Sequence, residues 1–229
     1  MHKIVLIDFA GTLILPEVLD EANKLRSSIL QRGLPTTAEH SHPEALYKAN
    51  REAIGALTGI QDGFSLQYRE NDLQRLTLTG EQVQNQMATN LFQLGMYLAA
   101  KKYGLKMFPE GFLDQLQRMK RLGYKLAIVS GVREDIITGM FVIAQMPVQF
   151  DWIYGQPPIL GVSNEDNMRD LQQYGSLAFV LGDKMSDLEA GKTSQAKTIF
   201  VTWGHPSGEE EAFADYTIHD PKELESIIN

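Results

Sequence analysis

The sequence predicts a doubly wound α/β protein with a mostly parallel sheet, into which an all-helical segment is inserted. Short β-branched apolar runs alternate with helical patterns from about residue 107 onward, as in parallel strands joined by helices. A further apolar run stands near the N-terminus, and the residues between it and this alternation show only helical patterns. We therefore expect one sheet whose first strand is separated from the others by a helical insertion.

Strands are expected where apolar residues follow one another without interruption. Such runs occupy Ile4–Ile7, Leu126–Val129, Leu177–Leu181 and Thr198–Val201, with a weaker one at Phe150–Tyr154. Continuous apolar runs indicate strands that are covered on both faces, which is the usual condition of a parallel sheet.

Helices are expected between these strands. Residues 109–122 place Phe112, Leu116 and Met119 on one face and end before Gly123, a residue favoured just after a helix. Further helical patterns cover Val132–Met146, Glu165–Tyr174 and Lys184–Ser194.

The inserted segment has its own helical patterns, at Pro16–Arg32, Pro43–Leu57 and Glu81–Tyr103. The last of them aligns Val83, Met87, Leu91, Leu94 and Leu98 on one apolar stripe. We therefore predict an α/β core domain of residues 1–15 and 105–229, and a helical domain of residues 16–104.

Composition narrows the classes of function. The chain of 229 residues has a net charge of −8 and no run of Lys or Arg, so a nucleic-acid partner is not expected. It has no cysteine, which excludes disulfides, thiolate catalysis and cysteine-ligated zinc. The apolar run near the N-terminus is too short for a signal sequence, and no run is long enough to span a membrane. We expect a cytoplasmic protein without a membrane partner.

Polar residues follow three of the predicted strands. Asp8 follows the first, Ser130 and Gly131 follow the second, and Asp183 follows the fourth, with Asp187 one helical turn beyond it. Ligands of open α/β sheets bind at the carboxyl ends of the strands. Taken alone, each acid is more often a helix cap or a surface residue, but the three carboxylates together suit Mg²⁺. A carboxylate there can attack phosphorus, and Ser130 can hold phosphoryl oxygens.

Three stretches carry a resemblance to a known family: IDFAGTLI (7–14), YKLAIVSG (124–131) and FVLGDKMSDLEAGKTSQAKTIFVTWG (179–204). In these stretches the chain resembles the haloacid dehalogenase superfamily of phosphatases and related hydrolases. Its tail, ADYTIHDPKELESII, looks like the closing strand and helix of that family. The resemblance implies a Rossmann-like core and, in the helical insertion, a C1-type cap that opens and closes over the site.

The resemblance also implies roles for individual residues. Asp8 corresponds to the nucleophile, and Asp8 and Asp183, with Ser130, are the expected catalytic residues. The expected ligands of Mg²⁺ are Asp8, the Ala10 carbonyl, Asp183 and Asp187. The expected contacts to phosphate or substrate are Thr12, Ser130, Gly131, Gln156 and Lys184.

Two positions depart from the family pattern. Ala10 stands where most phosphatases of the family have a second aspartate, which protonates the leaving group and later activates water. Without that acid, a phosphomonoesterase forgoes a factor of about 10²–10⁴ in rate. Gln156 stands where the family has a basic residue, and Arg133, Arg169 or Lys184 are the candidates to supply charge instead.

We therefore predict a Mg²⁺-dependent hydrolase of a small phosphorylated metabolite that works through an aspartyl-phosphate on Asp8. One alternative follows from the DxAGT pattern, which also resembles phosphonoacetaldehyde hydrolases. Those enzymes cleave a C–P bond with the help of a cap lysine, for which Lys24 and Lys48 are candidates here, although Thr36 stands at that family's lysine position. The other alternative is a family member that has lost catalysis and keeps a binding or regulatory role.

Overall fold

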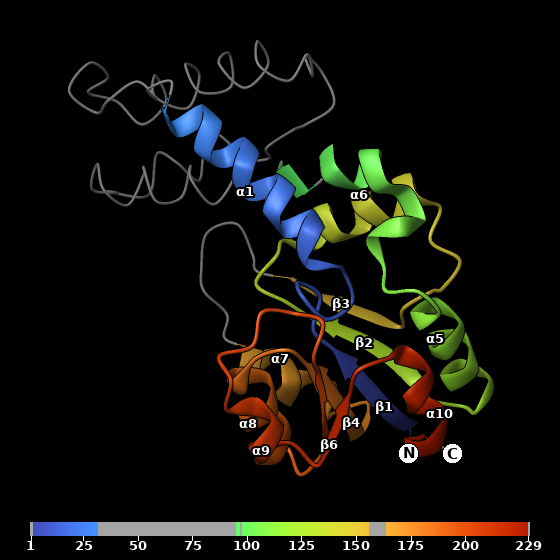
Figure 1. Ribbon diagram of the computed structural model, residues 1–229. Helices are drawn as coiled ribbons and strands as arrows, with labels where there is room; N and C mark the ends of the chain where they lie inside the picture. The colour runs from blue at the N-terminus through green and yellow to red at the C-terminus, as the bar shows by residue number, and fades with distance from the viewer. Residues whose placement is uncertain (1, 32–94, 97, 156–163, 229) are drawn as a thin grey trace, which may run out of the picture. The chain divides into compact units, whose positions relative to one another are not determined.

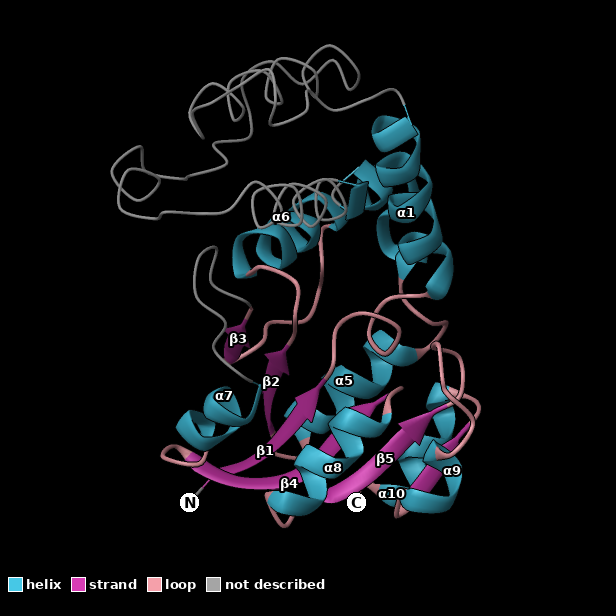
Figure 2. Ribbon diagram, turned by 90° about the vertical axis from the view of Figure 1, so that its left-hand side faces the viewer, coloured by secondary structure: helices cyan, strands magenta, loops and turns pink. Residues whose placement is uncertain are grey.

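The computed structural model of the protein describes residues 2–31, 95–96, 98–155 and 164–228. Within these residues six strands form one parallel sheet in the order β3-β2-β1-β4-β5-β6 (Figure 2). The strands are β1 (His2–Ile7), β2 (Lys125–Val129), β3 (Trp152–Tyr154), β4 (Gly175–Gly182), β5 (Lys197–Val201) and β6 (Tyr216–Ile218). The doubly wound α/β fold that the alternation predicts is therefore confirmed.

Helices cover both faces of the sheet. Figure 1 shows α7 and α8 on one face and α5 and α10 on the other. The helices are α1 (Pro16–Gln31), α5 (Phe112–Arg121), α6 (Glu134–Ala144), α7 (Asn164–Leu171), α8 (Met185–Thr193), α9 (Glu210–Phe213) and α10 (Leu224–Ile227), with 3-10 turns η1 (Gly104–Met107) and η2 (Pro221–Glu223). One part of the core joins Ile4 and Leu6 of β1 to Met168 and Leu171 of α7, all of them buried.

Several predicted boundaries differ from the structure by a few residues, and two of them differ for local reasons that the contacts show. Helix α5 begins at Phe112 because Gly111 adopts a left-handed conformation, with φ of 79°, which a helix cannot continue through. Strand β3 begins at Trp152 because Phe150 instead stacks on Phe141 of α6, with ring centroids 5.5 Å apart. Neither change moves the carboxyl end of a strand.

The chain divides into two compact units, Met1–Ala22 with Met96–Asn229, and Asn23–Gly95. The predicted helices at residues 43–57 and most of 81–103 lie outside the described residues. The assignment of residues 16–104 to an all-helical cap therefore stays a prediction.

Edge strand β6 is joined to β5 through Asp215, the residue that precedes it. Asp215 accepts hydrogen bonds from the amide and the hydroxyl of Thr198, at 2.8 and 3.0 Å, and pairs with Lys192 at 2.9 Å. Burial acts to raise the pKa of Asp215, but the bonds from Thr198 and Lys192 outweigh it and lower the pKa to about 2. The charged carboxylate therefore stabilises the fold.

Replacing Asp215 by asparagine is expected to lower the free energy of unfolding by about 1–2 kcal/mol at pH 7, because charge-assisted hydrogen bonds are lost. The folded pKa lies below the ordinary value of 3.8, so this stabilisation is complete above about pH 4 and disappears as the pH falls toward 2. Urea denaturation at several pH values measures it. Asp166→Asn, which breaks an exposed ion pair with Arg169, is the control and should change stability by less than about 0.5 kcal/mol. An equal loss in both variants would contradict the prediction.

Candidate functional site

Three neighbouring strands end together at one edge of the sheet. Ile7 of β1 is in register with Ile128 of β2 and with Leu181 of β4. The amide of Asp8 continues this ladder by donating to the Leu181 carbonyl at 2.9 Å. Consequently the polar residues that follow β1, β2 and β4 emerge side by side, as the sequence predicts.

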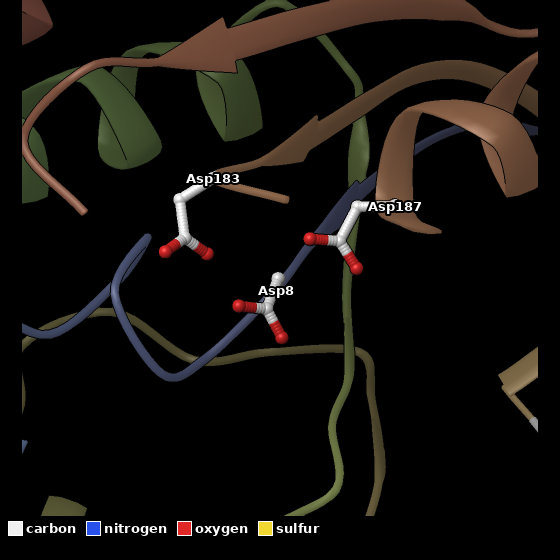
Figure 3. A group of neighbouring side chains, drawn as sticks. All are labelled: Asp8, Asp183 and Asp187. Carbon is white, nitrogen blue, oxygen red and sulfur yellow. The ribbon is translucent and has the colours of Figure 1, made fainter. Parts of the chain in front are cut away.

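Three acids form a cluster at this edge. Asp8 follows β1, Asp183 follows β4 and Asp187 lies in the first turn of α8. Each offers a carboxylate oxygen within 4.8 Å of the others, and the three carboxylates converge on one space (Figure 3). Asp183 is completely buried, and Asp8 and Asp187 are each 8% exposed. These acids are therefore enclosed by the fold and do not lie on a solvated surface.

Crowding makes the negative charge of this cluster unfavourable. Burial, together with the charges of Asp187 and Asp183, raises the pKa of Asp8 well above its ordinary value, against an opposing effect of Lys184. Burial and the charge of Asp183 likewise raise the pKa of Asp187 to about 6. A divalent cation would relieve this repulsion, and carboxylate oxygens are the ligands that Mg²⁺ prefers. The donor set therefore fits such an ion.

Asp183 is held by segments from two parts of the chain. The Thr12 hydroxyl donates to Oδ1 at 3.4 Å, and the His205 amide donates to Oδ2 at 2.8 Å. A Cβ at Gly11 would lie 2.4 Å from Oδ2, and the φ of Gly11 is +94°. Both the space and the backbone conformation therefore require glycine at position 11.

Ser130 is fixed just beyond β2. Its amide donates to the Tyr154 carbonyl at 2.9 Å, and its Oγ accepts from the Val132 amide at 3.1 Å. A Cβ at Gly155 would lie 2.2 Å from the Glu134 amide nitrogen, so the loops after β2 and β3 are in close contact. With Oγ already accepting one bond, the hydroxyl proton can be directed at a phosphoryl oxygen.

The structure brings together most of the predicted site residues that it describes. Thr12 contacts Asp183, and the charge of Lys184 partly offsets the rise in the pKa of Asp8. Ala10 lies in the turn after β1, where it forms an isolated bridge with Ile14, and Gly131 is exposed beside Ser130. Gln156 lies outside the described residues.

One part of the site escapes sequence reasoning. His205 is exposed, yet its backbone amide contacts Asp183, and no side-chain pattern in the sequence indicates such a contact. The preceding Trp203 donates to the Thr12 carbonyl at 2.9 Å. The signal available in the sequence is the run VTWG directly after a strand, which does not by itself indicate which groups make contact.

Comparison with known proteins identifies the family. The family model described as "Haloacid dehalogenase-like hydrolase" matches residues 60–201, more than half of the chain. A phosphoglycolate phosphatase of Aquifex aeolicus is 25% identical, over 99% of this chain and 97% of that protein. A D-glycero-β-D-manno-heptose-1,7-bisphosphate 7-phosphatase of Haemophilus influenzae is 27% identical, over 53% of this chain and 83% of its own length.

Solved structures share the fold. A haloacid dehalogenase-like hydrolase of Streptococcus pneumoniae superposes with a TM-score of 0.64 at 16% identity, covering 100% of this chain and 99% of the other. A β-phosphoglucomutase of Clostridium difficile gives 0.60 at 13% identity, over 99% and 96%. In the described residues no helix is long and apolar enough to cross a membrane. The sheet, the motif order and the family match together show that this chain belongs to the haloacid dehalogenase-like hydrolases.

Proposed function

We propose that this protein is a Mg²⁺-dependent phosphatase of a small phosphorylated metabolite, with Asp8 as the nucleophile. The observation that carries the proposal is the buried cluster of Asp8, Asp183 and Asp187 at the carboxyl edge of the sheet. Burying three acids within 4.8 Å of one another is unfavourable unless a cation or a reaction uses them. Structural ion-pair networks instead place a base beside each acid.

The residues that would hold Mg²⁺ are Asp8, Asp183 and the Ala10 carbonyl, with Asp187 contributing directly or through water. When bound, Mg²⁺ would supply positive charge that neutralises the carboxylates and the phosphoryl oxygens, so that an anionic nucleophile can approach an anionic phosphate.

In the proposed reaction an Asp8 carboxylate oxygen attacks phosphorus, and the bond from phosphorus to the leaving oxygen breaks. The Ser130 hydroxyl donates a hydrogen bond to a phosphoryl oxygen and holds the group in line. Water, activated by a group other than residue 10, then attacks the phosphorus of the aspartyl-phosphate. The bond from phosphorus to the Asp8 oxygen breaks, the water proton passes to phosphate or solvent, and inorganic phosphate leaves with Asp8 restored. Thr12 keeps Asp183 oriented through its hydroxyl.

Lys184 is proposed to balance the charge of the phosphoryl group. It is exposed and directly follows Asp183, and its positive charge partly offsets the rise in the pKa values of Asp8 and Asp187. Gln156, which takes the usual basic position, is uncharged and would contribute hydrogen bonds alone. Gly131 would allow the phosphate to approach the backbone closely.

Ala10 bears on the choice of substrate. Alanine cannot protonate a leaving alkoxide, so the proposed enzyme favours compounds whose leaving group departs without a proton, such as acyl phosphates. Phosphoglycolate is the first monoester to test, because the Aquifex aeolicus relative is named as its phosphatase.

The same alanine also motivates a second candidate, C–P bond cleavage of phosphonoacetaldehyde. That reaction needs a lysine amine to form a Schiff base with the aldehyde. Lys24, exposed on α1, is the candidate among the described residues, and Lys48 lies outside them. Borohydride should then trap the aldehyde covalently on the protein, and an untrapped protein would exclude this route. Binding of Mg²⁺ and phosphate without turnover of any compound would instead favour a regulatory role.

Removing the metal tests the leading proposal. Turnover of a panel containing phosphoglycolate, acyl phosphates and phosphonoacetaldehyde should fall to background in excess EDTA and return with added Mg²⁺. Mg²⁺ at 100 times its Kd should also stabilise the fold by about 2.7 kcal/mol, which a thermal melt measures. NaCl at the same ionic strength is the control and should do neither. Full turnover in EDTA would overturn the metal-dependent mechanism.

A further inference from the structure

We propose that Trp203 is a positioning residue for the acid cluster. It fastens the segment 202–205, which we call the β5 exit segment, to the turn that follows Asp8, and this keeps the Asp183 carboxylate aimed into the site. The inference rests on the proposed function, because its main consequence is an effect on the affinity for a divalent cation.

Asp183 takes its orientation from two segments that are far apart in the sequence. Thr12 in the turn after β1 donates to one carboxylate oxygen, and His205 in the β5 exit segment donates to the other. The carboxylate therefore keeps its direction only while the turn and the β5 exit segment stay in register.

Trp203 links these two segments directly. Its indole Nε1 donates to the Thr12 carbonyl at 2.9 Å, in the same residue whose hydroxyl contacts Asp183. The ring of Phe112 packs edge-to-face against the indole, with centroids 5.8 Å apart. At the start of the β5 exit segment, the Thr202 amide donates to the Ile218 carbonyl at 3.1 Å. The segment is thus anchored at β6 and at the turn, with Asp183 bound between.

The β5 exit segment also lies in close contact with Asp183. A Cβ at Gly204 would lie 2.3 Å from both the Cβ and the Oδ2 of Asp183. The φ of Gly204 is outside the left-handed region, so glycine is needed at this position for space alone. Any shift of the β5 exit segment toward Asp183 would therefore displace the carboxylate.

Loss of the indole N–H should loosen the link between the β5 exit segment and the turn after β1. The Asp183 carboxylate would then be held less firmly, and cation binding should weaken. Groups that orient metal ligands typically change metal affinity by about 10–100-fold when they are removed. Trp203 acts through Thr12 and His205 rather than on Asp183 itself, so we expect the lower end, about tenfold.

The test compares Trp203→Phe with Trp152→Phe, which also replaces an indole by a phenyl ring. Trp152 lies on edge strand β3 and packs against Tyr174, with centroids 5.4 Å apart. Calorimetric titration with Mn²⁺ should give a Kd about tenfold weaker in Trp203→Phe and unchanged in Trp152→Phe. In metal-free protein, the amides of Leu13 and His205 should exchange hydrogen faster in Trp203→Phe alone.

A Mn²⁺ Kd in Trp203→Phe within twofold of the wild type would overturn the inference and leave the proposed function standing. Failure of the wild type to bind Mn²⁺ would count against the proposed function, and amide exchange in the metal-free protein would still test the link between Trp203 and the turn. If Trp203→Phe does not fold, Gly204→Ala decides the matter. Its added methyl overlaps Asp183, so at least a tenfold weaker Kd is expected, and an unchanged Kd would overturn the inference.

Discussion

Replacing Asp8 by asparagine is expected to lower turnover by at least about 10⁴-fold, because an amide cannot attack phosphorus to form the covalent intermediate. The carboxamide is close in size to the carboxylate, so the turn after β1 should keep its hydrogen bonds, in which Leu13 donates to the Asp8 carbonyl at 3.2 Å. The measurement is phosphate release under substrate saturation with Mg²⁺. Asp114→Asn, at an exposed site on α5, is the matched control and should retain full turnover.

The same variant separates loss of chemistry from loss of fold. Asp8 is buried beside two other acids that raise its pKa, so its charge destabilises the metal-free protein. Asp8→Asn should therefore raise the melting temperature of metal-free protein at pH 7–8 by a few degrees, roughly the effect of 1–2 kcal/mol in a chain of this size. An inactive variant that melts higher supports the proposed role of Asp8. Full turnover in Asp8→Asn would exclude the nucleophile mechanism.

Replacing Ala10 by aspartate is expected to raise the hydrolysis of phosphate monoesters with poor leaving groups by about 10²–10⁴-fold. The new carboxyl group would stand two residues after Asp8, in the turn that forms the bridge with Ile14, and could protonate the leaving alkoxide. Acyl phosphates, whose leaving group needs no proton, should gain little. The ratio of kcat/KM for a monoester to that for an acyl phosphate measures the effect.

Ala10→Asn is the control, because it adds a side chain of the same size that cannot transfer a proton. If wild-type protein cleaves a compound with a good leaving group and needs Asp8 to do so, the alanine is a specialisation. If only Ala10→Asp hydrolyses esters, the site is an intact scaffold whose acid has been lost, and a binding role becomes the better proposal. If this ratio of kcat/KM values is the same in wild type, Ala10→Asp and Ala10→Asn, position 10 is not the place from which an acid protonates the leaving group.

Local patterns in the sequence determined the fold and the identity of the cluster. Continuous apolar runs predicted β1, β2, β4 and β5 because strands buried on both faces have no polar side to alternate with. The positions of Asp8 and Asp183 followed, since the carboxyl ends of parallel strands share one edge. Asp187 followed from the helical spacing at the start of α8. Each of these features is visible within one short segment, because the apolar runs of strands and the spacing of helices involve only a few consecutive residues.

The tertiary structure alone decided how the cluster is held. Thr12 and Trp203 are 191 residues apart in the sequence, and Thr12 and Asp183 are 171 apart. Whether they touch depends on the order of the strands and on their register, which no local pattern specifies. The same holds for Gly204, whose need for space appears only once Asp183 is packed against it. The acids are therefore readable from the sequence, whereas the contacts that orient them arise from the packing of distant segments.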